Sequence, residues 1–392
     1  MDSDSSNNNH KTPKADVEKH SGVEKEAKPP APAVAPSPPP NGGLVAWLQI
    51  AAGFILFFNT WGLLNAFAIT GLVAGPIYDR GYLRLLLITG SFMVVFGHMM
   101  LSLCTEYWQV LLSQAFCVGI GSGLLFTPTI SLLPTYFSTH MGLAVGIASS
   151  GPSLGGVIYP IVLYRLLSQV GFPWAVRSLA FIALATFILP LAVMRVRVRV
   201  PKPRAVVDWT AFRDAPFMVF TLSVLIVFIG NAVLIFYVSF YPANKGFTNE
   251  SLVFYMAAIF NAGSILGRIA PNALSDRIGV FNTMAPITLI LGITVLCMAA
   301  VENEAGMIVE AIVTGFFSGV VVALPPVCFR VLTENRSMIG TRMGKGFAIL
   351  GKVEPLNWTG LWAYGGVAGI LSGLFVAVVR IIRVGVALNA KA

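Results

Sequence analysis

Ten long apolar stretches constrain what this chain can fold into more than any other feature of its sequence. A helix needs about 20 consecutive apolar residues to cross the hydrocarbon core of a membrane. Hydrophobic residues make up 56% of the 392 residues and charged residues only 11%, whereas soluble chains are about a quarter charged. The sequence therefore predicts an all-α polytopic membrane protein. The stretches lie at residues 44–66, 85–104, 108–130, 141–166, 173–194, 215–241, 251–271, 281–301, 306–329 and 358–380, with shorter apolar pieces at 67–78 and 340–351.

Two polar segments divide the chain into parts. Residues 1–43 are rich in Ser, Asn, Lys, Glu and Pro. They cannot bury enough apolar area to offset the entropy of ordering, so we expect a disordered cytoplasmic tail. Residues 195–214 carry six Lys/Arg and two Asp and are predicted to be a basic cytoplasmic linker. It joins an N-terminal helical bundle, residues 44–194, to a C-terminal bundle, residues 215–383, and a short cytoplasmic tail follows at 384–392.

The loop charges predict one orientation in the membrane. Residues 44–392 hold 21 Lys/Arg and 11 Asp/Glu, and cytoplasmic loops of membrane proteins collect Lys and Arg. This basic excess lies between apolar segments, which argues against a nucleic-acid partner. The expected partners are a lipid bilayer, with the plasma membrane favoured, and a small-molecule solute; no obligate protein partner is evident. The expected cytoplasmic positions are Arg80, Arg84, Arg195 to Arg204, Arg277, Arg330, Arg336, Arg342, Arg380 and Arg383, and the expected outside positions are Glu106, Glu250, Glu302 and Glu304.

The sequence carries no pattern typical of an enzyme. It has no phosphate-binding loop, no nucleophile elbow and no HExxH. The four cysteines lie in or beside apolar runs, without CxxC spacing or a nearby histidine, so they are interpreted as small apolar residues. We therefore expect no enzymatic activity, no cofactor and no metal.

Two short loops repeat one pattern on either side of the basic linker. The first runs from Gly75 to Arg84 and contains Asp79-Arg80-Gly81, and the second runs from Asn272 to Gly279 and contains Asp276-Arg277. Each places an Asp-Arg pair and a glycine at the cytoplasmic end of a predicted helix. Two halves repeated in parallel are typical of major facilitator transporters. Asp79, Arg80, Asp276 and Arg277 are therefore predicted gating residues, and both carboxylates should accept hydrogen bonds from helix N-termini or arginines.

The sequence resembles fungal members of the monocarboxylate-porter group of the major facilitator superfamily, of the riboflavin/monocarboxylate transporter type. The resemblance covers about residues 41 to 380. It implies two pseudo-symmetric six-helix bundles, twelve helices in the parent, and transport of a small organic solute such as a monocarboxylate by alternating access. The motifs that carry it lie at residues 41–47, 136–151, 261–271, 340–344 and 357–362.

The predicted substrate site centres on Arg268. An arginine inside an apolar helix is costly unless it faces a cavity or a partner, and the resemblance implies that it binds a substrate carboxylate. The alternative is an arginine that reaches the cytoplasmic face. We expect Arg268 to line a central cavity near Asn261 and the seventh-helix aromatic Tyr237. Asn65 is the matching first-helix position.

Two departures from the family pattern affect the expected substrate. The family's proton-coupled members have an acidic residue one turn before the arginine and a lysine in the first helix, where this chain has Ser264 and Asn65. Without these groups, proton-coupled transport of a lactate-type acid loses its physical basis. Facilitated diffusion, another coupling residue, or a neutral or heteroaromatic substrate then fits better.

The fifth predicted helix contains Gly151-Pro152, which weakens a helix locally. These residues are predicted to make a pliable gate, with close helix packing as the alternative. The segment also partly resembles the antiporter signature of drug-efflux facilitators. The alternatives to the first functional interpretation are therefore a drug or secondary-metabolite efflux antiporter, or a truncated membrane protein that does not transport. Two further intramembrane groups, His98 and Glu310, are assigned to packing and to a wet helix end, respectively.

Two intervals are too short for a twelve-helix parent. Only 32 residues separate Trp47 from Asp79, where two crossings and a turn need roughly 45. Only 16 separate Arg342 from Trp358. These lengths predict two internal deletions, leaving about ten complete spans and two fragments. We expect residues 44–78 to form one long helix of about 52 Å, which would place the N-terminal tail opposite the basic linker.

Overall fold

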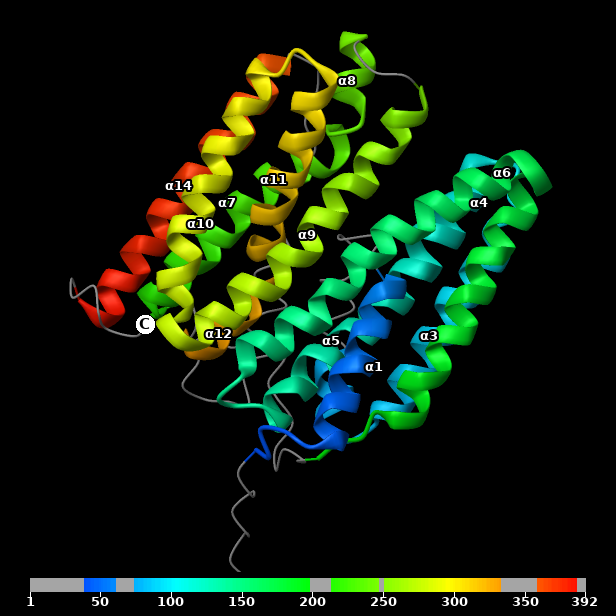
Figure 1. Cartoon of the computed structure of the whole chain (residues 1–392). Coiled ribbons are helices and arrows are strands. Elements are labelled where there is room, and N and C mark those ends of the chain that lie inside the picture. The colour runs from blue at the N-terminus through cyan, green and yellow to red at the C-terminus, as the bar shows by residue number, and fades with distance from the viewer. Residues whose placement is uncertain (1–38, 61–73, 198–212, 247–249, 333–357, 386–392) are drawn as a thin grey trace, which may run out of the picture. The chain divides into compact units, whose positions relative to one another are not determined.

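The computed structural model describes residues 39–60, 74–197, 213–246, 250–332 and 358–385. All of them belong to one compact unit, residues 38–392. Regular structure in these ranges is entirely helical (Figure 1). The predicted disordered tail, and with it any test of that prediction, lies outside the described residues.

The described part of the N-terminal half consists of helices in the following order. Helix α1 spans Leu44–Thr60, a short helical segment follows at 74–79, and α3 spans Leu83–Leu101. The next crossing combines α4, Tyr107–Val110, a π-helical stretch, Leu111–Val118, and α5, Gly119–Tyr136. Helix α6 spans Met141–Val193 and is broken at Gly171, where φ is +75°. A side chain is disfavoured at that φ, so glycine allows the chain to fold back on itself there.

The C-terminal half contains α7, Ala215–Tyr237, the short α8, Phe240–Lys245, and α9, Glu250–Ile278. It continues through α10, Val280–Cys297, a 3₁₀ turn at Met298–Ala300, α11, Glu304–Ala323, α12, Pro325–Leu332, and α14, Trp358–Val384. Polar caps start two of these helices. Asp214 accepts a hydrogen bond from the Phe217 amide at 3.3 Å, and Asn303 accepts one from the Gly306 amide at 2.6 Å. Such caps satisfy amides that have no partner within the helix.

Eight helices in the described ranges are long and apolar enough to cross a membrane. One of them, α6, has 53 residues, about 80 Å of helix, so its break at Gly171 makes it two crossings. Helix α1 adds a further 17 apolar residues. Each of the ten predicted spans therefore coincides with a helix or its described part, and the predicted all-helical fold is confirmed.

Hydrogen bonds place the start of α1 and the linker on one face. The amide of Asn41 donates to the Tyr136 carbonyl at 3.0 Å, and the Tyr136 hydroxyl donates to the Arg195 carbonyl at 3.0 Å. Gln49 donates to the carbonyl of Val193, also at 3.0 Å. The ends of α5 and α6 therefore meet the beginning of α1.

Helix α3 runs antiparallel to α5, since a Cβ on Gly90 would lie 2.9 Å from the Gly121 carbonyl oxygen and a Cβ on Gly97 would lie 2.6 Å from Val118. Arg80, just before α3, is thus on the face where α5 ends. The described end of the tail, residues 39–43, lies on this face too, because Asn41 is bonded to Tyr136 beside the linker. This end was expected on the opposite face, and that part of the expectation is wrong. The expected helix over residues 44–78 is described only over Leu44–Thr60 and 74–79, and the rest of it stays a prediction.

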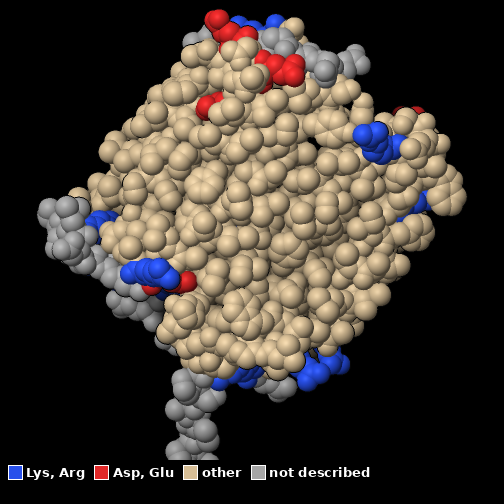
Figure 2. Space-filling view, viewed as in Figure 1, with Lys and Arg blue, Asp and Glu red and all other residues tan. Residues whose placement is uncertain are grey.

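Acidic groups gather at one end of the helices. Figure 2 shows them mainly at the top, whereas Lys and Arg lie at the bottom, at both sides and, in part, at the top. The opposite, basic end holds the linker residues Arg195 and Arg197 and, in the last turn of α9, Arg277. At the acidic end, Glu302 precedes α11 and Glu304 is its first residue. By the preference of Lys and Arg for the cytoplasmic side, the basic face is predicted to be cytoplasmic.

Cysteine accessibility tests this orientation. In a variant without the four native cysteines, Thr139→Cys on the basic face should react with a membrane-impermeant maleimide only after cells are permeabilised. Glu302→Cys should react in intact cells, because both positions are exposed but on opposite faces. The reverse labelling pattern would invert the assigned orientation.

Candidate functional site: an interhelical seam and a polar cavity

The two halves meet along α9 and the first segment of α6, which run antiparallel and side by side (Figure 1). We call this contact the α6–α9 seam. Small residues in both helices bring the backbones close, as is typical where helices associate within a membrane. The paired residues are Gly142 with Asp276, Gly146 with Asn272, Ser153 with Ser264, Gly156 with Asn261, and Tyr164 with Phe254.

Asp276 closes the end of the seam that lies on the basic face. Its two carboxylate oxygens accept hydrogen bonds from the amides of Gly142 at 2.7 Å and Leu143 at 2.9 Å. These amides lie in the first turn of α6, where a carboxylate is stabilised by the helix dipole. The hydrogen bonds expected for Asp276 are therefore present.

The other three residues of the repeated loops differ in their exposure. Asp79 is buried, with 5% of its surface exposed, whereas Arg80 and Arg277 are exposed. The gating roles of all four residues stay predictions.

Arg268 lies in the middle of the seam with 3% of its surface exposed. Its Nη1 donates to the Ser149 carbonyl on α6, and its Nε donates to the Ser264 hydroxyl at 3.3 Å. The Ser264 hydroxyl also accepts from Ser153 of α6 at 3.2 Å. In this conformation the guanidinium therefore links the two halves.

The four predicted substrate residues are only partly brought together. Arg268 and Asn261 lie on α9 about two turns apart. Tyr237 ends α7, which packs mainly on α14, whereas α9 packs on α6 and α11. Asn65 lies outside the described residues. The structure thus places Arg268 at the seam rather than beside Tyr237, and its substrate-binding role stays a prediction.

Gly151 and Pro152 are buried on α6, but Gly151 faces away from α9. A Cβ at Gly151 would run into the carbonyl of Phe54 on α1. The packing interpretation therefore accounts for Gly151, and the contact that it permits lies within the N-terminal half. Gly142, Gly146 and Gly156 are the glycines of this helix that face α9.

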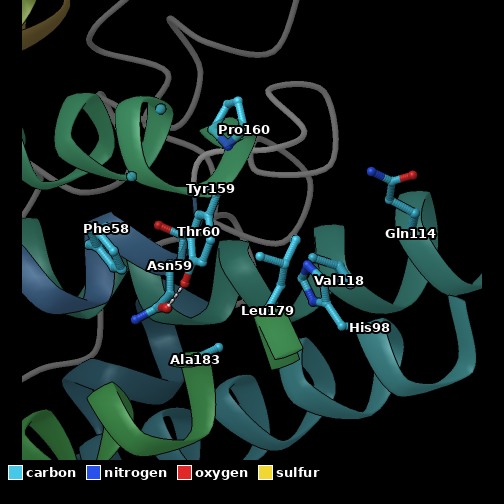
Figure 3. A pocket seen from close by; sticks show the side chains of 12 residues that line it. Phe58, Asn59, Thr60, His98, Gln114, Val118, Tyr159, Pro160, Leu179 and Ala183 are labelled. Atoms are coloured by element: carbon cyan, nitrogen blue, oxygen red, sulfur yellow. Dashed lines mark hydrogen bonds between the residues drawn. The ribbon is translucent and has the colours of Figure 1, made fainter. Parts of the chain in front are cut away.

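A cavity of about 210 Å³ opens in the N-terminal half (Figure 3). Its lining combines aromatic and aliphatic groups with uncharged polar ones, drawn from α1, α3, α6 and the crossing that contains the π-helical stretch. No Asp, Glu, Lys or Arg is among these residues. The lining consists of Phe58, Asn59, Thr60, His98, Gln114, Val118, Gly155, Gly156, Tyr159, Pro160, Leu179 and Ala183.

Asn59 fixes the polar side of this cavity. Its side-chain oxygen accepts a hydrogen bond from the Tyr159 hydroxyl (Figure 3). Its amide donates to the Thr186 hydroxyl and to the Ile55 carbonyl, both at 2.9 Å. The Tyr159 ring lies 5.1 Å from the ring of Phe58, so this network orients an aromatic wall.

The cavity wall reaches the seam. Gly156 lines the cavity, and a Cβ on it would lie 2.7 Å from the Cγ of Asn261. A change in the distance between α6 and α9 would therefore change the cavity. Asn59, His98 and Gln114 can be recognised in the sequence because they are polar residues within apolar stretches. Sequence reasoning missed Tyr159. The available signal was its spacing of three and four residues from Gly156 and Gly155, which places it on the same face of the helix.

Comparison with known proteins identifies the family. The model described as Major Facilitator Superfamily matches residues 44–349. The chain belongs to the major facilitator superfamily. It is therefore a multi-pass membrane transporter of a small molecule, and not an enzyme, as the sequence predicted. The structure of the transporter FucP in the outward conformation has the same fold, with a TM-score of 0.57 at 15% identity over 86% of this chain and 97% of that one.

Several curated relatives are fungal transporters. The MFS-type transporter dbaD of Emericella nidulans is 48% identical over 91% of this chain and 90% of its own length. The aspyridones efflux protein apdF of the same species is 32% identical over 84% of this chain and 74% of its own length. The agnestins efflux protein AgnL12 of Paecilomyces divaricatus is 33% identical over 82% and 77%, respectively.

The match to dbaD also bears on the short intervals of the sequence. The alignment covers 91% of this chain, yet it is 401 positions long and therefore longer than the whole chain of 392 residues. The alignment therefore includes positions that dbaD has and this chain lacks. This supports the expectation of internal deletions relative to a longer parent.

Replacing Asp276 tests the closed end of the seam. Asp276→Ala removes two hydrogen bonds to a charged acceptor and leaves two α6 amides without their partner, so the free energy of unfolding in detergent should fall by about 1–3 kcal/mol. Asp276→Asn keeps one acceptor oxygen and should lose less. Equal stability of Asp276→Ala and the unmodified protein in thermal unfolding would show that the carboxylate does not hold the seam.

Proposed function

We propose that this transporter exports a small, uncharged organic metabolite from the cell by alternating access. The observation that carries the proposal is the cavity beside the seam, whose lining, among the described residues, is amphipathic and without charged side chains. Two of its relatives are named as efflux proteins of fungal metabolites, aspyridones and agnestins. Export of a secondary metabolite is therefore favoured over uptake of a monocarboxylate.

The chemistry of the lining disfavours a carboxylate substrate. An anion in a low-dielectric site needs a cation or several hydrogen-bond donors. The cavity offers the side-chain amide of Gln114 as a donor and the hydroxyl oxygens of Thr60 and Tyr159 as acceptors, which suit carbonyl and hydroxyl groups. The guanidinium of Arg268 is held by Ser149 and Ser264 at the seam.

The shape of the cavity favours a planar ring. Phe58 and Tyr159 present two aromatic faces tilted by 43°, and aromatic rings stack on planar partners. A volume of about 210 Å³ is below the usual range of drug-sized sites. One ring system, alone or as part of a larger metabolite, fits this volume.

The seam supplies the element that moves in the proposed mechanism. Asp276 and Arg268 hold α6 against α9 through contacts to the Gly142 amide and the Ser149 carbonyl. Opening the cytoplasmic side requires these contacts to exchange for others in the second state, and Gly156 transmits the movement to the cavity. With the basic face in the cytoplasm, the proposed location is the plasma membrane.

Export can be measured in yeast cells that produce the full chain and are loaded with a neutral fluorescent anthraquinone or with labelled lactate. Cells with the transporter should lose the anthraquinone faster than cells with an empty vector, and lactate retention should not change. Faster loss of lactate alone would contradict the proposed substrate class. No effect on either compound would contradict export of this class.

Tyr159→Phe tests the cavity in the same assay. The change keeps the ring but removes the hydrogen bond from the Tyr159 hydroxyl to Asn59, which orients the aromatic wall. The apparent affinity for the probe should therefore fall about fivefold, corresponding to about 1 kcal/mol. Tyr82→Phe, at an exposed position before α3, is the matched control. Equal export by all three proteins would exclude the Tyr159 wall from the site.

A further inference from the structure

We propose that His98 binds the proton whose entry drives export, and that proton and metabolite compete for the one cavity. The inference rests on the proposed function and adds to it the coupling ion and the residue that takes it. His98 lies on α3 and lines the cavity (Figure 3). It is the single histidine in the described membrane-spanning helices.

A hydrogen bond fixes the state of the His98 ring. Its Nδ1 lies 2.8 Å from the carbonyl oxygen of Val94. A carbonyl can only accept, so Nδ1 must carry hydrogen. In the neutral ring Nε2 is then the unprotonated nitrogen, and its lone pair is the position where a proton adds.

The surroundings of His98 give that proton a route. Gln114, Asn59 and Thr60 line the same cavity as His98. A volume of about 210 Å³ exceeds the roughly 30 Å³ that a water molecule occupies in the liquid. Water can therefore fill the cavity when it holds no metabolite and carry protons to the ring.

The helices around His98 offer no described counter-charge within the cavity. Helix α1 has no titratable residue across it, and the π-helical stretch contributes Cys117, whose thiol bonds the Met93 carbonyl. Helix α6 contributes the Tyr159 hydroxyl, which is bonded to Asn59, and Arg177, which donates to Ser102 one turn beyond His98. Arg177 carries the same charge as the imidazolium and disfavours it.

Competition between proton and metabolite follows from these surroundings. An imidazolium without a counter-charge is stable in a membrane only while water solvates it. A neutral metabolite that enters the cavity displaces this water, so the ring must release its proton. Proton binding at the outer face likewise favours a wet cavity and expels the metabolite. One proton enters the cell from the outside solution for each metabolite that leaves, and no other reactant is needed.

Glu310 is the competing candidate for this role. It lies on α11 in the other half, does not line the cavity, and its Oε1 has no hydrogen-bond partner among the described residues. It is therefore too remote from the cavity water for direct competition with the metabolite. Glu310→Gln is the matched control for His98→Gln.

The transport test uses the full chain in proteoliposomes, the neutral anthraquinone, and a membrane potential clamped with potassium and valinomycin. A one-to-one exchange should drive the probe against its gradient by up to about tenfold per pH unit. His98→Gln should lose this uphill transport, whatever rate of downhill transport remains, whereas Glu310→Gln should keep it. Uphill transport that persists in His98→Gln would overturn the proposal.

Nuclear magnetic resonance of the protein labelled at histidine, in nanodiscs, separates this proposal from the proposed function. The chain has four histidines, and His98→Gln identifies the relevant signal. That signal should change with pH, and the anthraquinone should move the midpoint of the change to lower pH. If the His98 signal of the unmodified protein titrates but this protein does not transport the probe, the result counts against the proposed substrate class and not against the role of His98. Downhill transport with a His98 signal unchanged by pH and probe would overturn the role of His98 alone.

Discussion

Close backbone approach along the α6–α9 seam is the constraint on which the rest of the structure depends. Within a membrane, apolar side chains gain little by leaving lipid for protein, so helices associate through small residues and polar contacts. Gly142, Gly146 and Gly156 give α6 a face on which α9 can lie, while Gly151 and Gly155 give it a second face for α1. One helix thereby joins the core of its own half to the other half, and any shift of α9 is passed to α1 and to the cavity between them.

The cost of charge in an apolar medium organises the polar groups of this seam and cavity. Asp276 is at the end of the seam on the basic face, where helix amides complement its charge. Arg268 is deeper and uses a backbone carbonyl and a serine hydroxyl as acceptors. The described lining of the cavity is neutral, and His98 and Tyr159 are its titratable residues. Fixed charges thus hold helices together, and the space open to a solute remains uncharged, which is why we assign it a neutral substrate.

More of the fold than of the candidate site could be predicted from the sequence, and the reasons can be named. Span positions follow from runs of apolar residues, and the Asp276 contact follows from a repeated loop at matching places in two halves. Gly151 faces α1, whereas other glycines of α6 face α9. In a helix with so many glycines, the spacing of the glycines does not show which of them faces which neighbouring helix. Tyr159 was missed because its importance comes from Asn59, 100 residues earlier in the chain. The face on which residues 39–43 lie was mispredicted, because the contact of Asn41 with Tyr136, 95 residues later, cannot be inferred from the length of an apolar run.

The serine at position 264 links the seam to the coupling mechanism. The resemblance to the monocarboxylate-porter group implies an acidic, titratable residue one turn before the arginine, where this chain has Ser264. With Ser264 in that place, Arg268 has a hydroxyl at 3.3 Å and turns to Ser149 of α6 for a second acceptor. A serine instead of an acid at position 264 thus has two consequences: the arginine links the two halves, and the seam has no titratable side chain at that position. If export is proton-driven, the proton must then bind elsewhere, and among the residues of the cavity His98 has a ring nitrogen available to receive it.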